Sequence, residues 1–326
     1  MLLDAQLAPA VAELAAEVTV TATDEDEVTA SFQGEHLAGS AQKVASDLGA
    51  LLYKCAHARL DHGKSLTPRT FSDPGFDRLF HEAVGERDTR REVRVAREDG
   101  EHAVVVLDGV RVTVPRDSLD REGQEGQEDG ETFLRLSWAR PALSPGFFFL
   151  TSCAAPMPRR TGGLMRLYAH VADPGHAPGL LAKVAGHLED RGLPWQAKAS
   201  SNRGLYPRTD AVVVYLPRVS WVAARDLAAL LESGGDLAKG TSAFTHPLTA
   251  SVGAAFEPSD KRPGRESLSF GQHRCGVLAE ALVTHAAADD GQSLTGRIVA
   301  MCNDASIDPL NPARNLSSPV TPVIPA

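Results

Sequence analysis

The chain has 326 residues and a formal net charge of −9, from 33 lysines and arginines and 42 aspartates and glutamates. An acidic chain with no basic tail does not fit a dedicated nucleic-acid binder, and no apolar run approaches the roughly 20 residues that a membrane-spanning helix needs. The four cysteines (Cys55, Cys153, Cys275 and Cys302) lack metal-ligand spacing. We therefore expect a reduced, cytoplasmic protein with no metal, no cofactor and no membrane or nucleic-acid partner.

The first 62 residues are expected to be mostly helical. Apolar residues recur at helical spacing in VAELAAEV and again in GSAQKVASDLGALLYKCAHARL. The polar and β-branched stretch TVTATDEDEVTASF between them gives no clear assignment. After a loop over 62–75, FDRLFHEAVG predicts a short helix that ends at Gly85.

Strands dominate the region from 91 to 119. Two runs of alternating apolar residues are followed by a third, and the dipeptide Asp108-Gly109 between the last two favours a hairpin turn. The acidic segment 120–131 is expected to be a surface loop. We place a boundary near residue 145, so that 1–145 form a helical and β-hairpin N-terminal region.

The second half alternates between strands and helices. Its expected elements are a strand in RLYAHV, a helix from Pro178 to Gly192, strands in QAKAS and YPRTDAVVVYL, a helix capped by Ser220, an extended stretch in FTHPLTASVGAAFEP and a helix in SFGQHRCGVLAEALVTHAA. The fold class is α+β, with a mixed or antiparallel sheet flanked by helices over 146–303. The Pro/Ser-rich tail, 304–326, is expected to pack poorly.

A basic island lies inside this acidic chain. Residues 159–218 contain nine lysines and arginines but four acidic residues, a pattern that favours an anionic ligand. Alternation in RLYAHV predicts that Arg166, Tyr168 and His170 share one face of a strand. Arg159 and Arg160 precede that strand, and we expect them to contact the same anion.

Two further strands complete the predicted cationic face. Lys198 lies on the first, and Arg208 and Asp210 lie at the start of the second. The helix that begins in SFGQHRC carries His273 and Arg274 in its first turn, where helix termini also bind anions. A capped helix start would explain that turn equally well.

These residue types suit the β-elimination of phosphate from phosphoserine or phosphothreonine. Arginine forks hold a phosphate bidentately, and a lysine crowded by arginines has its ammonium form disfavoured, so its amine accepts a proton. A tyrosine or histidine on the same face could protonate the departing oxygen. Taken singly, the same residues fit a plainer alternative, an anion-binding protein with a solvated Lys198 and a structural pair of Arg208 and Asp210.

The motifs GGLMRLYAHV, WQAKAS, YPRTDAVVVYL, FTHPLTASVGAAFEP and SFGQHRCGVLAEAL together resemble the HopA-type type III effector family. Relatives in actinomycetes belong to biosynthetic clusters for class V lanthipeptides and thioamitides. The resemblance implies a cytoplasmic lyase without cofactors that acts on a precursor peptide phosphorylated by a separate kinase, leaving dehydroalanine or dehydrobutyrine. Residues 1–145 would then support the site or contact the leader peptide or the kinase.

Site roles follow from the resemblance to phosphothreonine lyases, which use a lysine base and a histidine acid. Lys198 matches the base. The acid position reads Tyr168, with His170 as the second choice, since the lyase pattern has histidine where this chain has tyrosine. The matching or candidate phosphate contacts are Arg166, Arg208, Arg159, Arg160 and Arg274, supported by Asp210 and His273.

Two other functions stay open. A non-catalytic module could use the same basic face to bind phosphopeptide or to activate the kinase. An effector-like protein could instead act on host partners.

Overall fold

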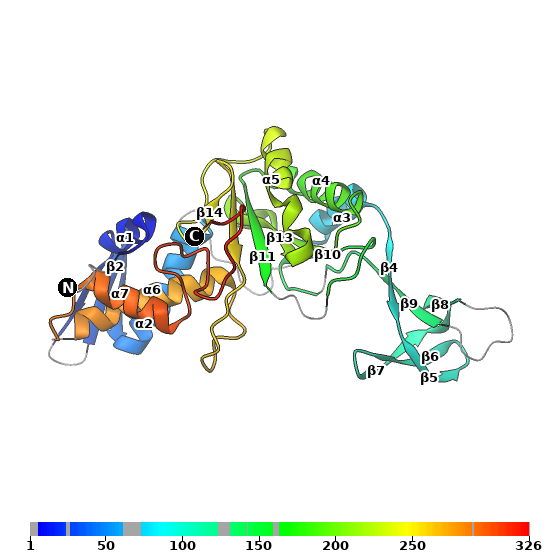
Figure 1. Cartoon of the computed structure of the whole chain (residues 1–326), viewed down its shortest axis with the longest axis horizontal. Coiled ribbons are helices and arrows are strands. Elements are labelled where there is room, and N and C mark those ends of the chain that lie inside the picture. Colours follow the sequence, from blue (N-terminus) through cyan, green and yellow to red (C-terminus); the bar gives the residue numbers. More distant parts are fainter. Residues whose placement is uncertain are drawn as a thin grey trace.

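The computed structural model of the chain describes residues 6–23, 27–60, 73–122, 131–141, 143–158, 163–288 and 290–325. These residues form an α+β fold in which every strand pairing is antiparallel, which confirms the predicted fold class. Figure 1 shows three parts along the longest axis: an N-terminal sheet with helices, a central sheet, and a smaller strand-rich part. None of the helices described here is long and apolar enough to cross a membrane.

The central sheet has six strands in the order β10-β12-β13-β11-β15-β14. Their bounds are Phe147–Thr151 for β10, Gln196–Ser200 for β12, Arg208–Pro217 for β13, Leu164–Val171 for β11, Val252–Phe256 for β15 and His246–Pro247 for β14.

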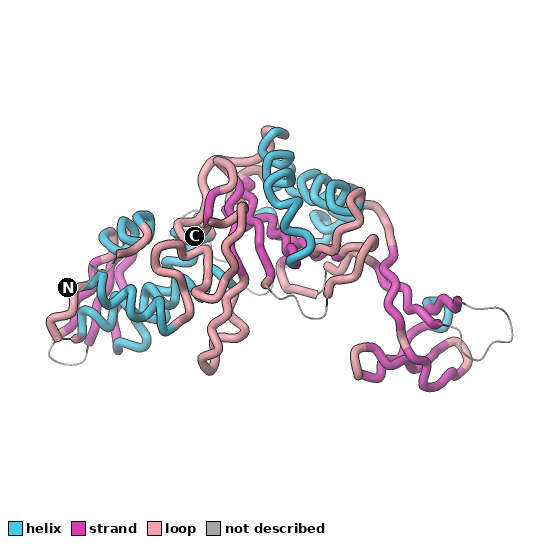
Figure 2. Tube along the Cα trace, viewed as in Figure 1, coloured by secondary structure: helices cyan, strands magenta, loops and turns pink. Residues whose placement is uncertain are grey.

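Two helices, α4 (Ala177–Glu189) and α5 (Ala224–Ser233), cover one face of the central sheet (Figures 1 and 2). The apolar stripe of α4, which includes Leu180, Leu181 and Val184, is fully buried. Because side chains alternate along a strand, the residues between the helix-facing ones point to the opposite face. That opposite face carries the predicted site residues Arg166, Tyr168 and Lys198.

Ser220 does not cap α5 as expected. A short 3-10 helix, Arg218–Ala223, precedes α5, and the Ser220 hydroxyl donates to the Pro194 carbonyl at 2.6 Å. The helix predicted from Pro178 to Gly192 is confirmed, and Gly192 follows it with a positive φ of 63°.

The N-terminal region is less helical than expected. The stretch that gave no assignment forms β1 (Thr19–Ala22) and β2 (Glu27–Phe32), which pair with β3 (Glu35–Ser40) in a three-stranded sheet. The helices in this part of the molecule are α1 (Pro9–Ala16), α2 (Ala41–Leu52), α6 (Phe270–Ala287) and α7 (Leu294–Asp304).

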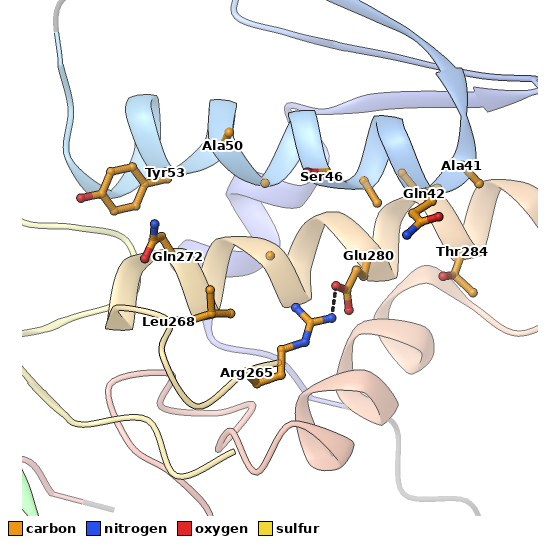
Figure 3. A pocket seen from close by; sticks show the side chains of 14 residues that line it. Ala41, Gln42, Ser46, Ala50, Tyr53, Arg265, Leu268, Gln272, Glu280 and Thr284 are labelled. Carbon is orange, nitrogen blue, oxygen red and sulfur yellow. Dashed lines mark hydrogen bonds and ion pairs between the residues drawn. The ribbon is translucent and has the colours of Figure 1, made fainter. Parts of the chain in front are cut away.

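Helices α2 and α6 lie side by side although more than 200 residues separate them in sequence (Figure 3). A Cβ atom added at Gly49 of α2 would lie 3.3 Å from the Cα of Gly276 on α6, so a side chain at position 49 would push the two helices slightly apart. The N-terminal segment and the C-terminal third therefore share one hydrophobic core.

A second, smaller core belongs to the strand-rich part. The strands there are β4 (Asp88–Glu92), β5 (Arg94–Asp99), β6 (His102–Leu107), β7 (Val110–Pro115), β8 (Leu119–Glu122) and β9 (Glu131–Ser137), in two three-stranded sheets. Val93, Val105 and Leu134 are buried in this core. The predicted hairpin turn is confirmed, with positive φ angles at Asp108 and Gly109. Helix α3 (Pro74–Val84) precedes this part and ends at Gly85, also as predicted.

The C-terminal tail packs well, so the expectation of poor packing is wrong. Ala313, Val323 and Ile324 are buried, and the Arg314 guanidinium donates to three tail carbonyls, those of Ser318, Pro319 and Ile324. The division into 1–145, 146–303 and 304–326 stays a prediction, because it assigns roles that packing does not test.

Candidate functional site

The strand register places the predicted acid and base in one row across the central sheet. Tyr168 of β11 is opposite Val213 of β13, and Val213 is in turn opposite Lys198 of β12. Since neighbouring strands lie about 4.8 Å apart, the Cα atoms of Tyr168 and Lys198 are about 10 Å apart, with both side chains on the face away from α4. Phe149 of β10 ends the row opposite Lys198.

Lys198 is a half-buried amine whose pKa is lowered to about 8, first by burial and then by the Arg166 guanidinium, with Arg208 acting in the same direction. Among the described residues it forms no ion pair with a carboxylate. Its Nζ lies 3.8 Å from the centre of the Phe147 ring, and the Arg208 guanidinium carbon lies 5.9 Å from the same centre. A lysine in this setting has a substantial neutral fraction near neutral pH.

Both predicted phosphate ligands are paired with carboxylates. Arg166 binds Glu257 through Nε and Nη2. Arg208 binds Asp210 in the same manner, at 2.6 and 2.9 Å, and both of these residues are buried. Within the described residues, Nη1 of either arginine has no hydrogen-bond partner, so each guanidinium keeps one free edge.

Two hydroxyl groups on this face are buried without a hydrogen-bond partner in the described part of the chain. They are Tyr168 Oη and Ser200 Oγ, and Ser200 lies two residues beyond Lys198 on β12. Burial raises the pKa of Tyr168, while the nearby Arg166 opposes that rise. Buried hydroxyls are seldom left unpaired, and neither oxygen is accessible to water here, so a ligand reaches them only when the side chains around them move.

Tyr53 and His57, which the sequence analysis missed, form another wall of the site. They lie on a π-helical turn, Tyr53–His57, that directly follows α2. The Tyr53 hydroxyl donates to Asp210 at 3.0 Å and accepts from Arg208 at 3.3 Å. The only sequence signal for this pair is the YKCAH spacing, which puts both rings on one side of a helix.

The buried His57 imidazole lies between Asp210 and Tyr168. Its Nε2 is 3.9 Å from an Asp210 oxygen, its Nδ1 is 2.8 Å from the Ser242 hydroxyl, and its ring meets that of Tyr168 edge-on at 5.5 Å. Burial lowers the pKa of His57 to about 4, so the ring is neutral at physiological pH. It serves as a neutral packing and hydrogen-bonding element.

A groove of about 700 Å³ runs between α2 and α6 and ends at Tyr53 (Figure 3). Small residues such as Ala45, Gly49 and Gly276 line its floor, and a pair between Arg265 and Glu280 lies along it.

His170, the second choice for the acid, is held by backbone carbonyls. Its Nδ1 lies 3.0 Å from the Lys239 oxygen and 3.1 Å from the Gly240 oxygen, next to an irregularity in β11 between Ala169 and Val171. Burial lowers its pKa. Because of this irregularity and these hydrogen bonds, His170 does not follow the strand alternation that predicted it on the same face as Tyr168.

Arg274 and His273 form hydrogen bonds away from the Lys198 face. Arg274 donates to the carbonyls of Pro312 and Arg314 and to the Asn315 side chain, so it anchors the C-terminal tail. His273 is fully buried between Arg274 and Asp260. The expected phosphate contact of Arg274 is therefore not supported by its position.

Arg159 and Arg160 lie outside the described residues. The structure thus brings Lys198, Arg166, Arg208, Asp210 and Tyr168 to one face, and adds Tyr53, His57, Phe147 and Glu257 to them. This arrangement combines an amine of lowered pKa with two oriented guanidiniums.

One comparison with known proteins identifies the family of this chain. No curated protein matches the chain. Two effector proteins of known structure, from Pseudomonas syringae pv. tomato strain DC3000 and pv. syringae strain 61, share 13% and 15% identity with it; each alignment covers 84% of this chain and 95% of the other, with a TM-score of 0.46. That likeness is too low to bear on activity. The model of the HopA1 effector protein family matches residues 138–314, more than half of the chain, and the protein therefore belongs to the HopA1 effector protein family.

Proposed function

We propose that this protein is a lyase that removes phosphate from phosphoserine or phosphothreonine in a ribosomally made precursor peptide. It acts in the cytoplasm after a separate kinase has phosphorylated the peptide, and it leaves dehydroalanine or dehydrobutyrine. The kinase and the lanthipeptide or thioamitide setting rest on the sequence resemblance, while the chemistry rests on the residues around Lys198.

The elimination needs a base and an acid. The neutral Lys198 amine takes the Cα proton, the freed electron pair forms the Cα=Cβ double bond, and the Cβ–O bond breaks. Tyr168 gives its proton to the bridging oxygen as phosphate leaves, and the proton on Lys198 then returns to the phenolate through solvent. A raised pKa keeps Tyr168 protonated before the reaction, as a proton donor must be.

Arg166 and Arg208 would hold the phosphate through their free Nη1 edges. Glu257 and Asp210 already orient the two guanidiniums, so little reorganisation is needed when the anion arrives. This use of the arginines leaves both salt bridges intact.

The observation that carries this proposal is the half-buried Lys198 amine, which has a lowered pKa and no carboxylate partner within the described chain. The test is incubation of purified protein with a synthetic phosphothreonine peptide and no kinase, followed by phosphate release and peptide mass. We expect Lys198→Ala to reduce the rate by about 10²–10⁴-fold. Lys183→Ala, at an exposed lysine paired with Asp236, is the matched control and should leave the rate unchanged. Normal elimination by Lys198→Ala would refute the assignment of the base.

The acid is tested by two separate variants. Tyr168→Phe removes the hydroxyl group, which has no hydrogen-bond partner in the described structure, so the fold should survive. The rate of elimination should fall at least about 10²-fold. His170→Gln keeps a hydrogen-bonding side chain near the Lys239 and Gly240 carbonyls and should have little effect on the rate. The opposite ranking would make His170 the acid.

A non-catalytic phosphopeptide-binding or kinase-activating module is the second candidate. It is favoured by the carboxylate pairing of Arg166 and Arg208, because paired arginines also suit a purely structural or binding role. The kinase-free incubation separates the two functions, since only a lyase converts phosphopeptide into phosphate and an alkene.

A further inference from the structure

A second pair of arginines lies at the outer edge of the central sheet. Beyond β10, a cavity of about 170 Å³ is lined by polar residues of β4, β10 and β12 and by Arg140, which follows β9. Arg91 and Arg140 both line it, together with Thr151 and Gln196. The fold thus brings two guanidiniums from separate segments to one concave surface.

This cavity is on the same face of the sheet as Lys198. Gln196 precedes Lys198 by two residues on β12, and Thr151 of β10 is directly opposite Gln196. Since side chains two residues apart share a face, Thr151 and Gln196 connect the cavity to the Lys198 row. The bridge between Ala139 and Leu150 places Arg140 opposite Phe149, which is opposite Lys198, so the Cα atoms of Arg140 and Lys198 are two strand spacings apart, about 10 Å, or about three residues of extended peptide.

The two arginines have no counter-ion among the described residues. Arg140 donates to the Ser137 carbonyl and to the Thr89 hydroxyl, each at 3.3 Å, and neither it nor Arg91 forms an ion pair with a described carboxylate. Burial lowers the pKa of Arg140, and the nearby Arg91 lowers it further.

The neighbouring charges do not cancel this pair. Arg90 at the rim binds Glu122 at 2.6 Å. Asp88, also at the rim, is exposed and forms no ion pair with Arg91 or Arg140. Two half-buried arginines without a carboxylate partner in the described chain form a site that a carboxylate or phosphate would complete.

We propose that Arg91 and Arg140 form a second anion subsite that binds a carboxylate or phosphate group about three residues away from the reacting residue of the peptide substrate. The inference rests on the proposed function for its substrate, and it assigns that substrate a flanking acidic or second phosphorylated residue. Arg91 and Arg140 bind and position the peptide and take no part in the elimination.

The test measures binding and does not depend on turnover. In a Lys198→Ala background, fluorescence anisotropy gives the affinity of labelled phosphothreonine peptides that carry alanine, glutamate or phosphoserine at the third and fourth positions on either side. We expect glutamate or phosphoserine to tighten binding about tenfold over alanine, with a gain that shrinks as salt rises. Glutamate alone giving the gain identifies a carboxylate ligand, and phosphoserine alone identifies a phosphate ligand.

Three substitutions then test whether this gain in affinity depends on Arg91 and Arg140. Arg140→Gln and Arg91→Gln should each reduce it to less than about twofold. Arg111→Gln, at an exposed arginine on β7 outside the cavity, should keep it in full. If Arg140→Gln fails to fold, Arg91→Gln decides the matter, because the Arg91 side chain makes no hydrogen bond within the described structure.

Equal affinity for all peptides, or a gain that survives both cavity variants, overturns the subsite. Its failure is distinct from failure of the lyase proposal, which is decided by phosphate release from protein with Lys198 intact. An arginine-dependent gain without elimination would keep the subsite and reject the lyase.

Discussion

Replacing Lys198 with methionine should make the protein more stable at neutral pH while abolishing elimination. The half-buried amine has a pKa of about 8, whereas the ordinary value is 10.5. Between these two pH values the unfolded chain binds more protons than the folded chain, so wild-type stability rises with pH across this window. Below about pH 8 the folded protein carries the full cost of a charged ammonium in a partly dry, cationic setting.

The size of this cost follows from the shift. At about 1.4 kcal/mol per pKa unit, the shift of Lys198 corresponds to about 3 kcal/mol. Partial solvent screening reduces that figure, and the Phe147 ring under Nζ offsets part of it because an aromatic face stabilises an ammonium. We therefore expect Lys198→Met, which keeps the aliphatic stem, to gain about 2 kcal/mol at pH 7.

Urea unfolding of wild type and variant at several pH values between 6 and 11 measures this gain. It should be constant below about pH 8 and fall as the pH rises toward 10.5. Lys43→Met, at an exposed lysine paired with Asp47, should change stability by less than about 0.5 kcal/mol at every pH. A loss of stability for Lys198→Met at pH 7, or a gain independent of pH, would refute the electrostatic reasoning about this amine.

Three more predictions concern the same site. Asp210→Asn should destabilise the protein by about 3–5 kcal/mol in urea unfolding, because it leaves the buried Arg208 guanidinium uncompensated; a loss below about 1 kcal/mol would contradict this. Gly271→Ala should cost about 1–3 kcal/mol, since the added Cβ would lie 2.1 Å from the His57 ring, and an unchanged unfolding midpoint would show that the ring moves freely. The rate of phosphate release at subsaturating peptide, which reports the free enzyme, should rise about tenfold per pH unit below pH 8 and level off above it, as Lys198 loses its proton; a flat profile would exclude Lys198 as the titrating base.

The local pattern of the chain predicted the strands of the central sheet well. Period-two alternation identified the face of β11 that carries Arg166 and Tyr168, and the hairpin dipeptide at Asp108 identified the β6–β7 turn. Both are short-range effects that depend on backbone pleating and turn geometry. The order of the strands, and so the row joining Tyr168 to Lys198, depends on pairing between distant segments and came from the structure.

Long-range packing explains what the sequence analysis missed. Tyr53 reaches Asp210 from a segment 157 residues away, and nothing in its own neighbourhood marks that contact. Arg274 at a helix start was expected to bind an anion, but the C-terminal tail folds back and supplies carbonyl acceptors. The tail has a poorly packing composition, yet the fully buried Ile324 and the nearly buried Arg314 secure it.

The balance of charge at the site suggests how one lysine could serve both deprotonation and product release. Arg166, Arg208 and Lys198 face two carboxylates, Glu257 and Asp210, so the empty site carries an excess of one positive charge when the amine is protonated. Binding of a phosphate dianion reverses that excess and, as an opposite charge nearby, raises the proton affinity of the amine. In the proposed reaction the amine would then be most basic while substrate is bound and less basic again when phosphate departs. In the proposed lyase, the two carboxylates would keep the three cations from holding the released phosphate too tightly for turnover.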